Sequence, residues 1–306
     1  MSPHRGSCFG FGIRSELEFD FLRTGDGDRL EIDVHDEDEP GEDETLVVEW
    51  RPQPGRAFHG RVYQDSESGR FRVWTSDAGW FLVDPQSRRI SVPADSEPVA
   101  REARLWTTPM LLTFVQMGAL PLHAAAVELD GRALLFGAPS QFGKTTLAAA
   151  FAARGSRLLA EDITCITANG NGPVIVPGPS LLRLRPDVAE SLRIPGTREV
   201  AVTPDRVFLT FEEELRGSSD PVPLGAVILL RGEEDRVAME RCVGPDLLRD
   251  LWALAFRLPN DHDTTRVFSG LTSLADAAPI WDLRRPWDLS KLGMTVDDIV
   301  EALDEG

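Results

Sequence analysis

Apolar and polar residues alternate over the first third of the chain, in short runs that turn-forming residues separate. The alternation has period two at 17–21, 30–34 and 71–74, which predicts strands with one buried face. The residues at 25–28 and 84–87 are typical of turns between such strands. These patterns predict a small antiparallel β domain.

A different pattern begins near residue 108. A helical stretch over 108–118 leads into apolar strand-like runs that alternate with Ala- and Leu-rich helical runs. This alternation is typical of an α/β architecture. We therefore divide the chain into an N-terminal β-rich domain at 1–105 and an α/β domain at 106–306. Within the second domain the later elements predicted are a buried strand at 226–230 and helices at 246–255 and 296–303.

The segment from Ala133 to Gly155 has the order strand, loop and helix. An apolar run over 133–136 precedes the loop, a helix-forming run over 147–154 follows it, and Gly155 is suited to cap that helix. This context predicts a phosphate-binding P-loop. The residues that we expect to bind ATP are Ala138, Pro139, Ser140, Gln141, Phe142, Gly143, Lys144, Thr145 and Thr146.

The residue types of this loop predict their roles. Backbone N–H groups and the positive end of the helix dipole favour phosphate. We expect Lys144 to hold the β- and γ-phosphates and the Thr145 hydroxyl to bind Mg²⁺. The usual pattern has glycine at the position of Ala138, and Gln141 and Phe142 replace small residues. Alanine is tolerated there if its φ is negative and strained if φ is positive. An ordinary strand–turn–helix without a nucleotide is the alternative.

The hairpin that precedes the loop brings a histidine to it. Asp130 and Gly131 separate two apolar runs, which predicts a two-residue hairpin turn. The resulting register, continued along the hairpin, sets His123 opposite Ala138 at the start of the loop. A catalytic role and a structural role for this histidine are equally compatible with the local sequence.

Two acidic residues follow the next predicted strand, at 157–160. A right-handed crossover returns that strand parallel to the first, so Glu161 and Asp162 open on the edge that carries the loop. Carboxylates at this edge suit a magnesium ligand and a general base for a hydroxyl. A helix N-cap or a surface pair is the alternative, and it suits Asp162 alone.

Charge narrows the range of partners. The 306 residues include 32 basic and 50 acidic ones, with a net charge of −18, which disfavours nucleic acid and anionic membranes. The acidic run 36–44 is either a solvated loop or a docking surface for a basic peptide. Only Lys144 and Lys291 are lysines, so one of two compact ammonium groups stands in the predicted loop.

The remaining composition indicates a cytoplasmic protein. Cys8, Cys165 and Cys242 are too widely separated to suggest a disulfide framework or a zinc site. No apolar run approaches the ~20 residues of a membrane span. The first residues also lack the pattern of a secretory signal.

In order and spacing, His123, the loop at 133–146 and the run at 158–162 resemble the HPr kinase/phosphorylase catalytic domain. The sequence is more similar still to the shorter HPr-kinase-like proteins of peptide natural-product gene clusters, including the lasso-peptide kinases. Their Leu-His-Ala-Ser/Ala-Ala-Val motif corresponds to 122–127 here. Further similar stretches lie at 182–187, 223–227 and 278–283, so the resemblance covers nearly the whole chain.

That resemblance implies a phosphoenolpyruvate-carboxykinase-like α/β fold, ATP with Mg²⁺, and phosphorylation of a serine. By position it implies that Lys144 grips phosphate and that Thr145 and Asp162 bind the metal. Glu161 would act with His123 as the base, although Glu161 replaces the first aspartate of the family's pair. The family's phosphorylase signature does not follow the acid pair, so we do not expect the reverse reaction.

The sequence therefore predicts an ATP-dependent serine kinase that acts on a precursor peptide or a small serine-containing molecule. Two alternatives stay open: a nucleotide-binding partner that presents a peptide to another enzyme, and an ATP hydrolase. Whether the chain forms a homo-oligomer also stays open. Arg183, Arg185 and Arg257 are candidates either to meet phosphate or a substrate carboxylate, or to form surface salt bridges.

Overall fold

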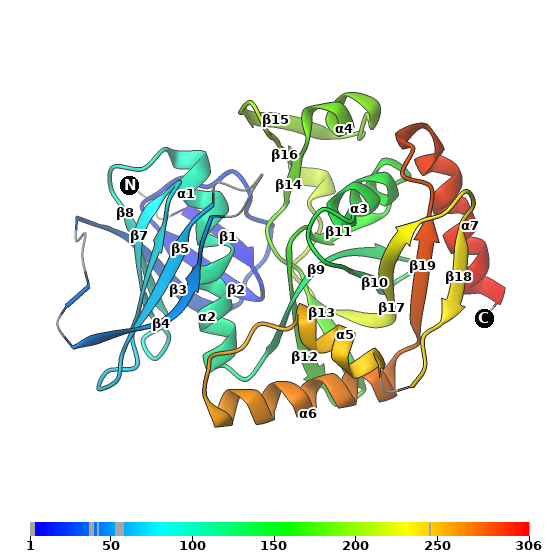
Figure 1. Ribbon diagram of the computed structural model, residues 1–306. Coiled ribbons are helices and arrows are strands. Elements are labelled where there is room, and N and C mark those ends of the chain that lie inside the picture. The colour runs from blue at the N-terminus through cyan, green and yellow to red at the C-terminus, as the bar shows by residue number, and fades with distance from the viewer. Residues whose placement is uncertain (1–3, 37–39, 42, 53–57, 245, 306) are drawn as a thin grey trace.

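The computed structural model describes residues 4–36, 40, 41, 43–52, 58–244 and 246–305. Within these residues the chain forms a β-rich part and an α/β part that lie side by side (Figure 1). The predicted α/β class is confirmed, since the second part packs helices against a large mixed sheet.

Eight strands of the described N-terminal part form one sheet, in the order β1-β2-β3-β8-β7-β6-β5-β4. Strands β1 to β8 span His4–Cys8, Phe11–Ser15, Asp28–His35, Glu44–Trp50, Gly60–Asp65, Phe71–Thr75, Gly79–Asp84 and Arg89–Pro93. The predicted strands at 30–34 and 71–74 are confirmed as parts of β3 and β6. The expected antiparallel pairing holds for five of the seven neighbouring pairs of this sheet, and β3 departs from it because it pairs in parallel with both β2 and β8. Period-two alternation reports which face of a strand is buried and does not report the direction of its neighbour.

The predicted strand at 17–21 is wrong. The side chain of Glu102, on α1 (Pro98–Leu105), accepts hydrogen bonds from the backbone N–H groups of Asp20 at 2.7 Å and Phe21 at 2.9 Å. The Glu102 carboxylate therefore accepts the backbone hydrogen bonds that a neighbouring strand would otherwise accept. Phe21 is nevertheless fully buried, which accounts for the apolar residue at the end of this pattern.

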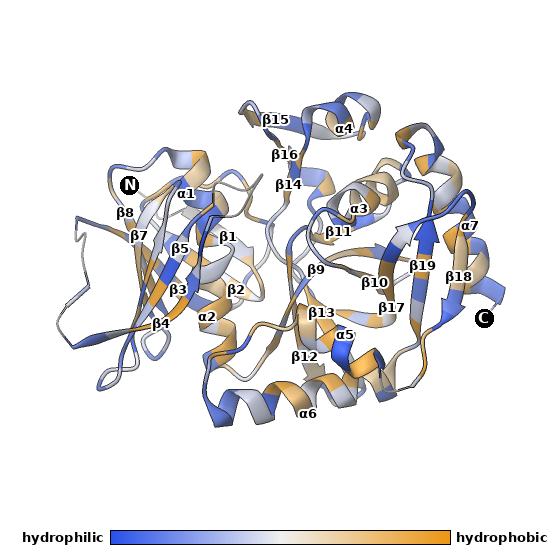
Figure 2. Cartoon of the chain, in the orientation of Figure 1, coloured by the Kyte–Doolittle hydropathy of each residue, from blue (hydrophilic) through white to orange (hydrophobic). Residues whose placement is uncertain are grey.

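Helix α2 (Thr108–Gln116) confirms the helix predicted near 108–118. Its residues from Pro109 to Val115 are buried, and Figure 2 shows its apolar character. Met110 and Phe114 belong to the hydrophobic core beneath the N-terminal sheet, together with Phe9 and Phe11. The domain boundary between residues 105 and 106 stays a prediction. Helix α2 follows that boundary in the chain and packs against the N-terminal sheet.

The second large sheet carries the predicted phosphate loop. Its strands are β9 (Leu120–Leu129), β10 (Arg132–Gly137), β11 (Arg157–Ala160), β12 (Ile163–Asn169), β13 (Gly172–Val176), β17 (Val222–Glu233), β18 (Ala238–Arg241) and β19 (Ile280–Arg285). β10 lies between β9, which is antiparallel, and β17, which is parallel, and β19 runs parallel to β17 on its far side. The ends of β10, β17 and β19 therefore open on one edge of the sheet. The strand predicted at 226–230 is confirmed within β17.

Helices cover both faces of this sheet (Figure 1). α3 (Lys144–Ala153) and α7 (Leu292–Glu305) contribute to the hydrophobic core on one face, and α5 (Asp246–Leu254) and α6 (Asp261–Ala277) to the core on the other. The helices predicted at 246–255 and 296–303 are thereby confirmed. Helix α6 was not predicted.

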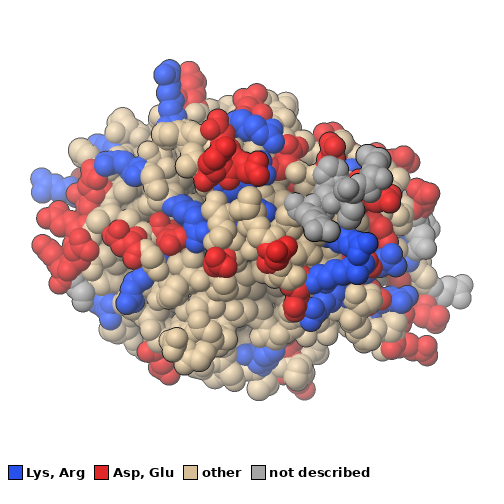
Figure 3. Space-filling model, turned by 180° about the vertical axis from the view of Figure 1, so that it is seen from behind, with Lys and Arg blue, Asp and Glu red and all other residues tan. Residues whose placement is uncertain are grey.

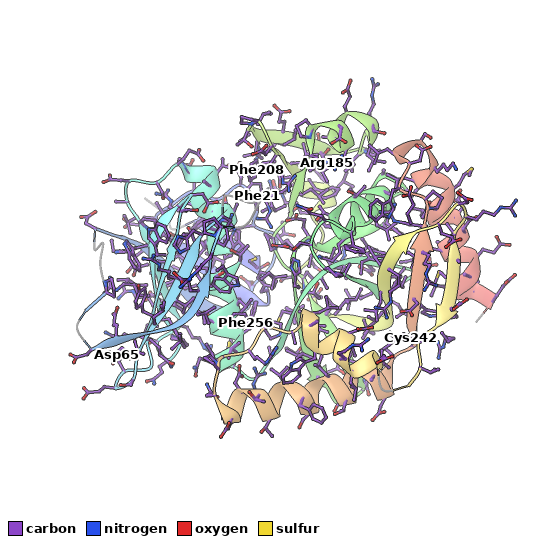
Figure 4. The ribbon with its side chains drawn as sticks, in the orientation of Figure 1. Phe21, Asp65, Arg185, Phe208, Cys242 and Phe256 are labelled. Carbon is purple, nitrogen blue, oxygen red and sulfur yellow. The ribbon has the colours of Figure 1, made fainter. Side chains whose placement is uncertain are left out.

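A small sheet of β14 (Leu181–Leu184), β16 (Val207–Phe211) and β15 (Thr197–Val202) stands beside α4 (Pro186–Ser191). The short 3₁₀ helices are η1 (Glu213–Leu215) and η2 (Leu289–Lys291). Figure 4 shows Phe21 and Phe208 together between the N-terminal part and this sheet, where both contribute to one apolar cluster with Leu181. This packing connects the N-terminal part to the strand that carries Arg183.

Charged side chains of both signs lie interspersed on the face seen from behind (Figure 3). Of the acidic run at 36–44, residues 37–39 and 42 lie outside the described residues, so its role stays a prediction. The three cysteines are free thiols. No helix in the described part of the chain has both the length and the apolar character to cross a bilayer.

Candidate functional site

The predicted phosphate-binding segment has the expected order of strand, loop and helix. β10 ends at Gly137, and α3 begins at Lys144, directly after Gly143, whose φ of 85° is left-handed. The loop thus leaves a buried strand in the middle of the sheet. The free N–H groups of the first turn of α3 lie at the edge where β10, β17 and β19 end, which is where open α/β sheets bind ligands.

The two departures from glycine in this loop differ in backbone conformation. Ala138 is buried and does not have a positive φ, whereas Gln141 has a φ of 72°. A left-handed conformation costs a non-glycine residue about 1–2 kcal/mol. Alanine is therefore accommodated at 138, and the strain of the loop is concentrated at 141.

Lys144 folds back over the loop. Its residue is only 6% exposed, and its Nζ donates to the carbonyl oxygens of Ala138 at 2.9 Å and Pro139 at 3.4 Å. The same Nζ lies 3.0 Å from Nε2 of His123. The ammonium group is thus held at the mouth of the loop by contacts with the loop and with β9.

His123 reaches the loop through the predicted hairpin. The observed pairing of β9 with β10 is that of a two-residue turn at Asp130 and Gly131, and it continues to Gly137 opposite Ala124. Nε2 of His123 faces Lys144 and also lies 3.5 Å from Oγ of Ser140. An ammonium group can only donate, so Nε2 is the acceptor and Nδ1 carries the ring proton.

The acid pair follows β11 at the same edge. β10 and β11 both run antiparallel to β9, one on each side of it, so they point in the same direction with β9 between them. Glu161 is 8% exposed, and the side chain of Asp162 is 33% exposed. The crossover through α3 therefore brings both carboxyl groups to the loop.

The contacts within the site reverse the pairing that the family resemblance implies. Nδ1 of His123 lies 3.2 Å from Oδ1 of Asp162 and 3.2 Å from its carbonyl oxygen. The Thr145 hydroxyl donates to Oε1 of Glu161 at 3.2 Å. Asp162 thus contacts the histidine and Glu161 contacts the threonine, because the longer glutamate side chain reaches across to the first turn of α3.

Arg183, on β14, holds the two carboxyl groups together. Its Nε donates to Oε2 of Glu161 at 2.8 Å, and its Nη2 donates to Oδ2 of Asp162 at 3.0 Å. From the sequence, both phosphate binding and a surface salt bridge were open to Arg183, and its contacts show an ion pair inside the site. The strand of a separate small sheet supplies it, so no local pattern could assign it.

The two carboxyl groups differ in proton affinity. Burial raises the pKa of Glu161, and the nearby Arg183 opposes that rise only in part. For Asp162, burial acts in the same direction, but the hydrogen bond from His123 and the charge of Arg183 outweigh it and hold its pKa well below the usual range. Asp162 therefore stays ionised at neutral pH.

Arg285, at the end of β19, is a further residue of the site that no sequence pattern predicted. The residue is 6% exposed, and its Nη1 donates to the carbonyl oxygen of Pro286 at 2.9 Å. A Cβ placed on Gly143 would overlap Nη2 of this guanidinium. Burial lowers the pKa of Arg285, and within the described residues it has no carboxylate partner. The available signal was an arginine at the end of an apolar strand that opens on the loop's edge.

The remaining predicted residues of the loop differ in how far they are exposed. Pro139 and Gln141 are exposed, while Ser140, Phe142, Thr145 and Thr146 are half-buried. Arg185 is an exposed residue that pairs with Asp187. Arg257 stacks on Trp252, with its guanidinium carbon 4.0 Å from the ring centroid.

A magnesium ion would find two oxygen donors side by side here, the Thr145 hydroxyl and the Glu161 carboxylate. Mg²⁺ keeps several waters and is usually held by one or two carboxylates together with substrate phosphates. No group of three or more His, Cys, Asp or Glu side chains suited to a metal occurs in the described part of the chain. The donors present therefore fit a metal that arrives with a nucleotide.

Comparisons with known proteins leave the family open. No protein-family model matches the chain, and no curated protein matches it. Among solved structures, it is similar to the Hpr(Ser) kinase/phosphatase from Coxiella burnetii, with a TM-score of 0.32 and 11% identity. That match covers 60% of this chain and 94% of the other. At this TM-score, function has to be argued from the site itself.

Proposed function

We propose that the protein is an ATP-dependent kinase that transfers the γ-phosphoryl group to a serine hydroxyl. The observation that carries the proposal is the contact of Lys144 with His123 at the mouth of the predicted P-loop, with the acid pair directly after β11. A loop for phosphates, a base and two carboxylates are the parts that phosphoryl transfer to a hydroxyl requires.

The phosphates would lie against the loop and the first turn of α3. Lys144 would exchange its contact with His123 for a β- or γ-phosphate oxygen, because a phosphate is a stronger acceptor for an ammonium group than a neutral imidazole. Arg285 would supply a second cation beside Gly143. Its burial without a carboxylate partner in the described chain is unfavourable unless an anion binds there.

A bound Mg²⁺ would supply positive charge against the phosphates during transfer. Thr145 and Glu161 are its proposed ligands, in place of the Thr145 and Asp162 implied by the resemblance. Glu161 accepts the Thr145 hydrogen bond and the Arg183 hydrogen bond on different oxygens. It can therefore turn one oxygen to a metal and keep the other on the arginine.

The proposed base is His123, supported by Asp162. With Nδ1 donating to Asp162, Nε2 has a lone pair directed at the phosphate loop, and release of Lys144 to the nucleotide would free it. The serine oxygen would attack the γ-phosphorus, its proton would pass to Nε2, and the bond to the β-γ bridging oxygen would break to release ADP. Asp162 would stabilise the imidazolium that forms.

The acceptor that we propose is a serine in a precursor peptide of a natural-product pathway, or free serine. This finer assignment is supported only by the sequence resemblance over 122–162. The acceptor has access from the side of His123, whose side chain is 39% exposed.

Transfer of label from γ-labelled ATP tests the proposal, with free serine and serine-containing peptides offered as acceptors. We expect labelled acceptor with the wild type, and none with Lys144→Ala or His123→Gln. Lys291→Ala and His262→Gln are matched controls, since these residues are exposed and lie outside the site. ATP binding without any transfer or hydrolysis would support the non-catalytic alternative, and phosphate release without acceptor would support the hydrolase.

A further inference from the structure

An aromatic pair joins the predicted phosphate loop to the segment that follows β19. Phe142, within the loop, and Trp287, two residues after the end of β19, have ring centroids 6.1 Å apart and planes at 76°. Trp287 is 49% exposed. Indole side chains are highly buried on average, so half of a tryptophan left open at this edge calls for a physical reason.

The pair is held rigidly. Phe142 packs against the hydrophobic core that α3 and α7 cover, together with Leu289 of η2. Before Trp287, buried Arg285 donates to the carbonyl oxygen of Pro286 at 2.9 Å. After it, Oδ1 of Asp288 accepts from the Ser290 backbone N–H at 2.9 Å. The open indole surface therefore belongs to a fixed connection between β19 and η2.

Arg285 links this aromatic pair to the phosphate loop. Its guanidinium lies against Gly143, which directly follows Phe142 in the chain. Arg285 itself precedes Trp287 by two residues. In a nucleoside triphosphate a ribose follows the phosphates, and a planar base follows the ribose. With the phosphates on the loop and Arg285, the base would lie one sugar further along, within reach of Trp287. Such a base stacks on aromatic side chains whatever its pattern of donors and acceptors.

We propose that Trp287, supported by Phe142, is the stacking surface for the purine base of the nucleotide. The inference rests on the proposed function, because it takes the triphosphate to lie on the loop. It adds a base-binding subsite to the phosphate contacts of the loop. The indole contributes to affinity for a nucleoside triphosphate and not to affinity for its phosphates alone.

Calorimetric titration of the full-length protein with Mg²⁺-ATP and with Mg²⁺-tripolyphosphate tests this subsite. We expect Trp287→Ala to weaken ATP binding by about 5- to 100-fold, the value of one base-aromatic stack. Tripolyphosphate binding should stay unchanged. Trp287→Phe keeps an aromatic ring and should retain most of the ATP affinity.

Phe268→Ala is the matched control. Phe268, on α6, is 51% exposed and makes a T-shaped contact at 6.4 Å with Trp252 of α5, so the two form a similar half-open aromatic pair. Its loss should leave binding of both ligands unchanged. Lys144→Ala should weaken both ligands together.

The outcomes separate the subsite from the proposed function. Unchanged ATP affinity in Trp287→Ala, with ATP still bound by the wild type, would overturn the stacking surface and leave the kinase proposal standing. Equal loss of ATP and tripolyphosphate in that variant would also overturn it, since it would indicate a distorted loop. A wild-type protein that binds neither ligand would overturn the proposed function and the subsite with it.

Discussion

Nζ of Lys144 lies 3.0 Å from Nε2 of His123, although the two residues are 21 positions apart in the chain. One lysine thus contacts both the loop carbonyls and the histidine of the neighbouring strand. The contact makes Nε2 an acceptor and directs the ring proton to Asp162. In this contact the ammonium group is the donor and Nε2 of the imidazole is the acceptor.

Replacing Lys144 by alanine should abolish phosphate binding. We expect a loss of transfer of at least ~100-fold, because a preorganised donor to developing charge is worth that much, and a loss of ATP affinity in titration. Lys291→Ala removes the only other lysine and should keep wild-type values. A Lys144→Ala protein with wild-type affinity for ATP would contradict the assignment of the loop.

The two carboxyl groups should be separable by their dependence on Mg²⁺. Glu161→Gln should raise the Mg²⁺ concentration for half-maximal transfer by about 10-fold or more. Asp162→Asn should lower the rate at saturating Mg²⁺ by about 100-fold, because the imidazole loses its orienting carboxylate. Initial rates measured over a series of Mg²⁺ concentrations give both quantities. The opposite result, with the metal effect in Asp162→Asn, would restore the assignment implied by the family resemblance.

Arg285 should strengthen nucleotide binding and should not stabilise the ligand-free fold. Its guanidinium is buried without a carboxylate partner in the described residues, so Arg285→Gln should weaken ATP binding by about 10-fold. The same variant should not lower the melting temperature without ligand, since it removes a buried charge. Arg284→Gln changes the exposed neighbour and serves as the control in both titration and thermal denaturation.

The left-handed conformation of Gln141 should be detectable as strain. Gln141→Gly should raise the free energy of unfolding by about 0.5–1 kcal/mol, because relief of strain exceeds the added entropy of the unfolded chain. Ser140→Gly, at a position without a positive φ, should lower it by about 0.5–1 kcal/mol. Urea denaturation measures both. Equal effects of the two substitutions would show that the strain is not borne at 141.

Glu102 should make stability depend on pH. Burial raises its pKa to about 7, despite the hydrogen bonds from Asp20, Phe21 and Trp106, against an ordinary value of 4.5. Between those two values the unfolded chain has lost the proton and the folded chain keeps it. The contribution of Glu102 is therefore present below pH 4.5 and is lost as pH rises to about 7.

The size of that loss should be about 3 kcal/mol, since one pKa unit corresponds to about 1.4 kcal/mol. Urea denaturation at several pH values from 4 to 8 would measure it. Glu102→Gln resembles the protonated acid and should flatten this part of the profile. A profile that is the same in wild type and variant would rule out Glu102 as its source.

Local patterns determined the framework of the candidate site. Asp130 and Gly131 set the register of β9 with β10, because a two-residue turn leaves one pairing of the strands on either side. The same register brings His123 to the loop, and the loop itself follows from an apolar strand, Gly143 and a helix-forming run. Each of these features depends on residues close together in the chain, where turn geometry and periodicity act directly.

Tertiary structure decided which groups meet within that framework. The pairing of Asp162 with His123 and of Glu161 with Thr145 depends on side-chain reach across two strands and a helix. Arg183 and Arg285 come from β14 and β19, far along the chain, and only the packing of those strands brings their charges to the loop. The sequence by itself thus determined a strand–loop–helix segment with a histidine and two acids beside it. The fold decided their contacts, because charge pairing between distant segments leaves no periodic trace in the sequence.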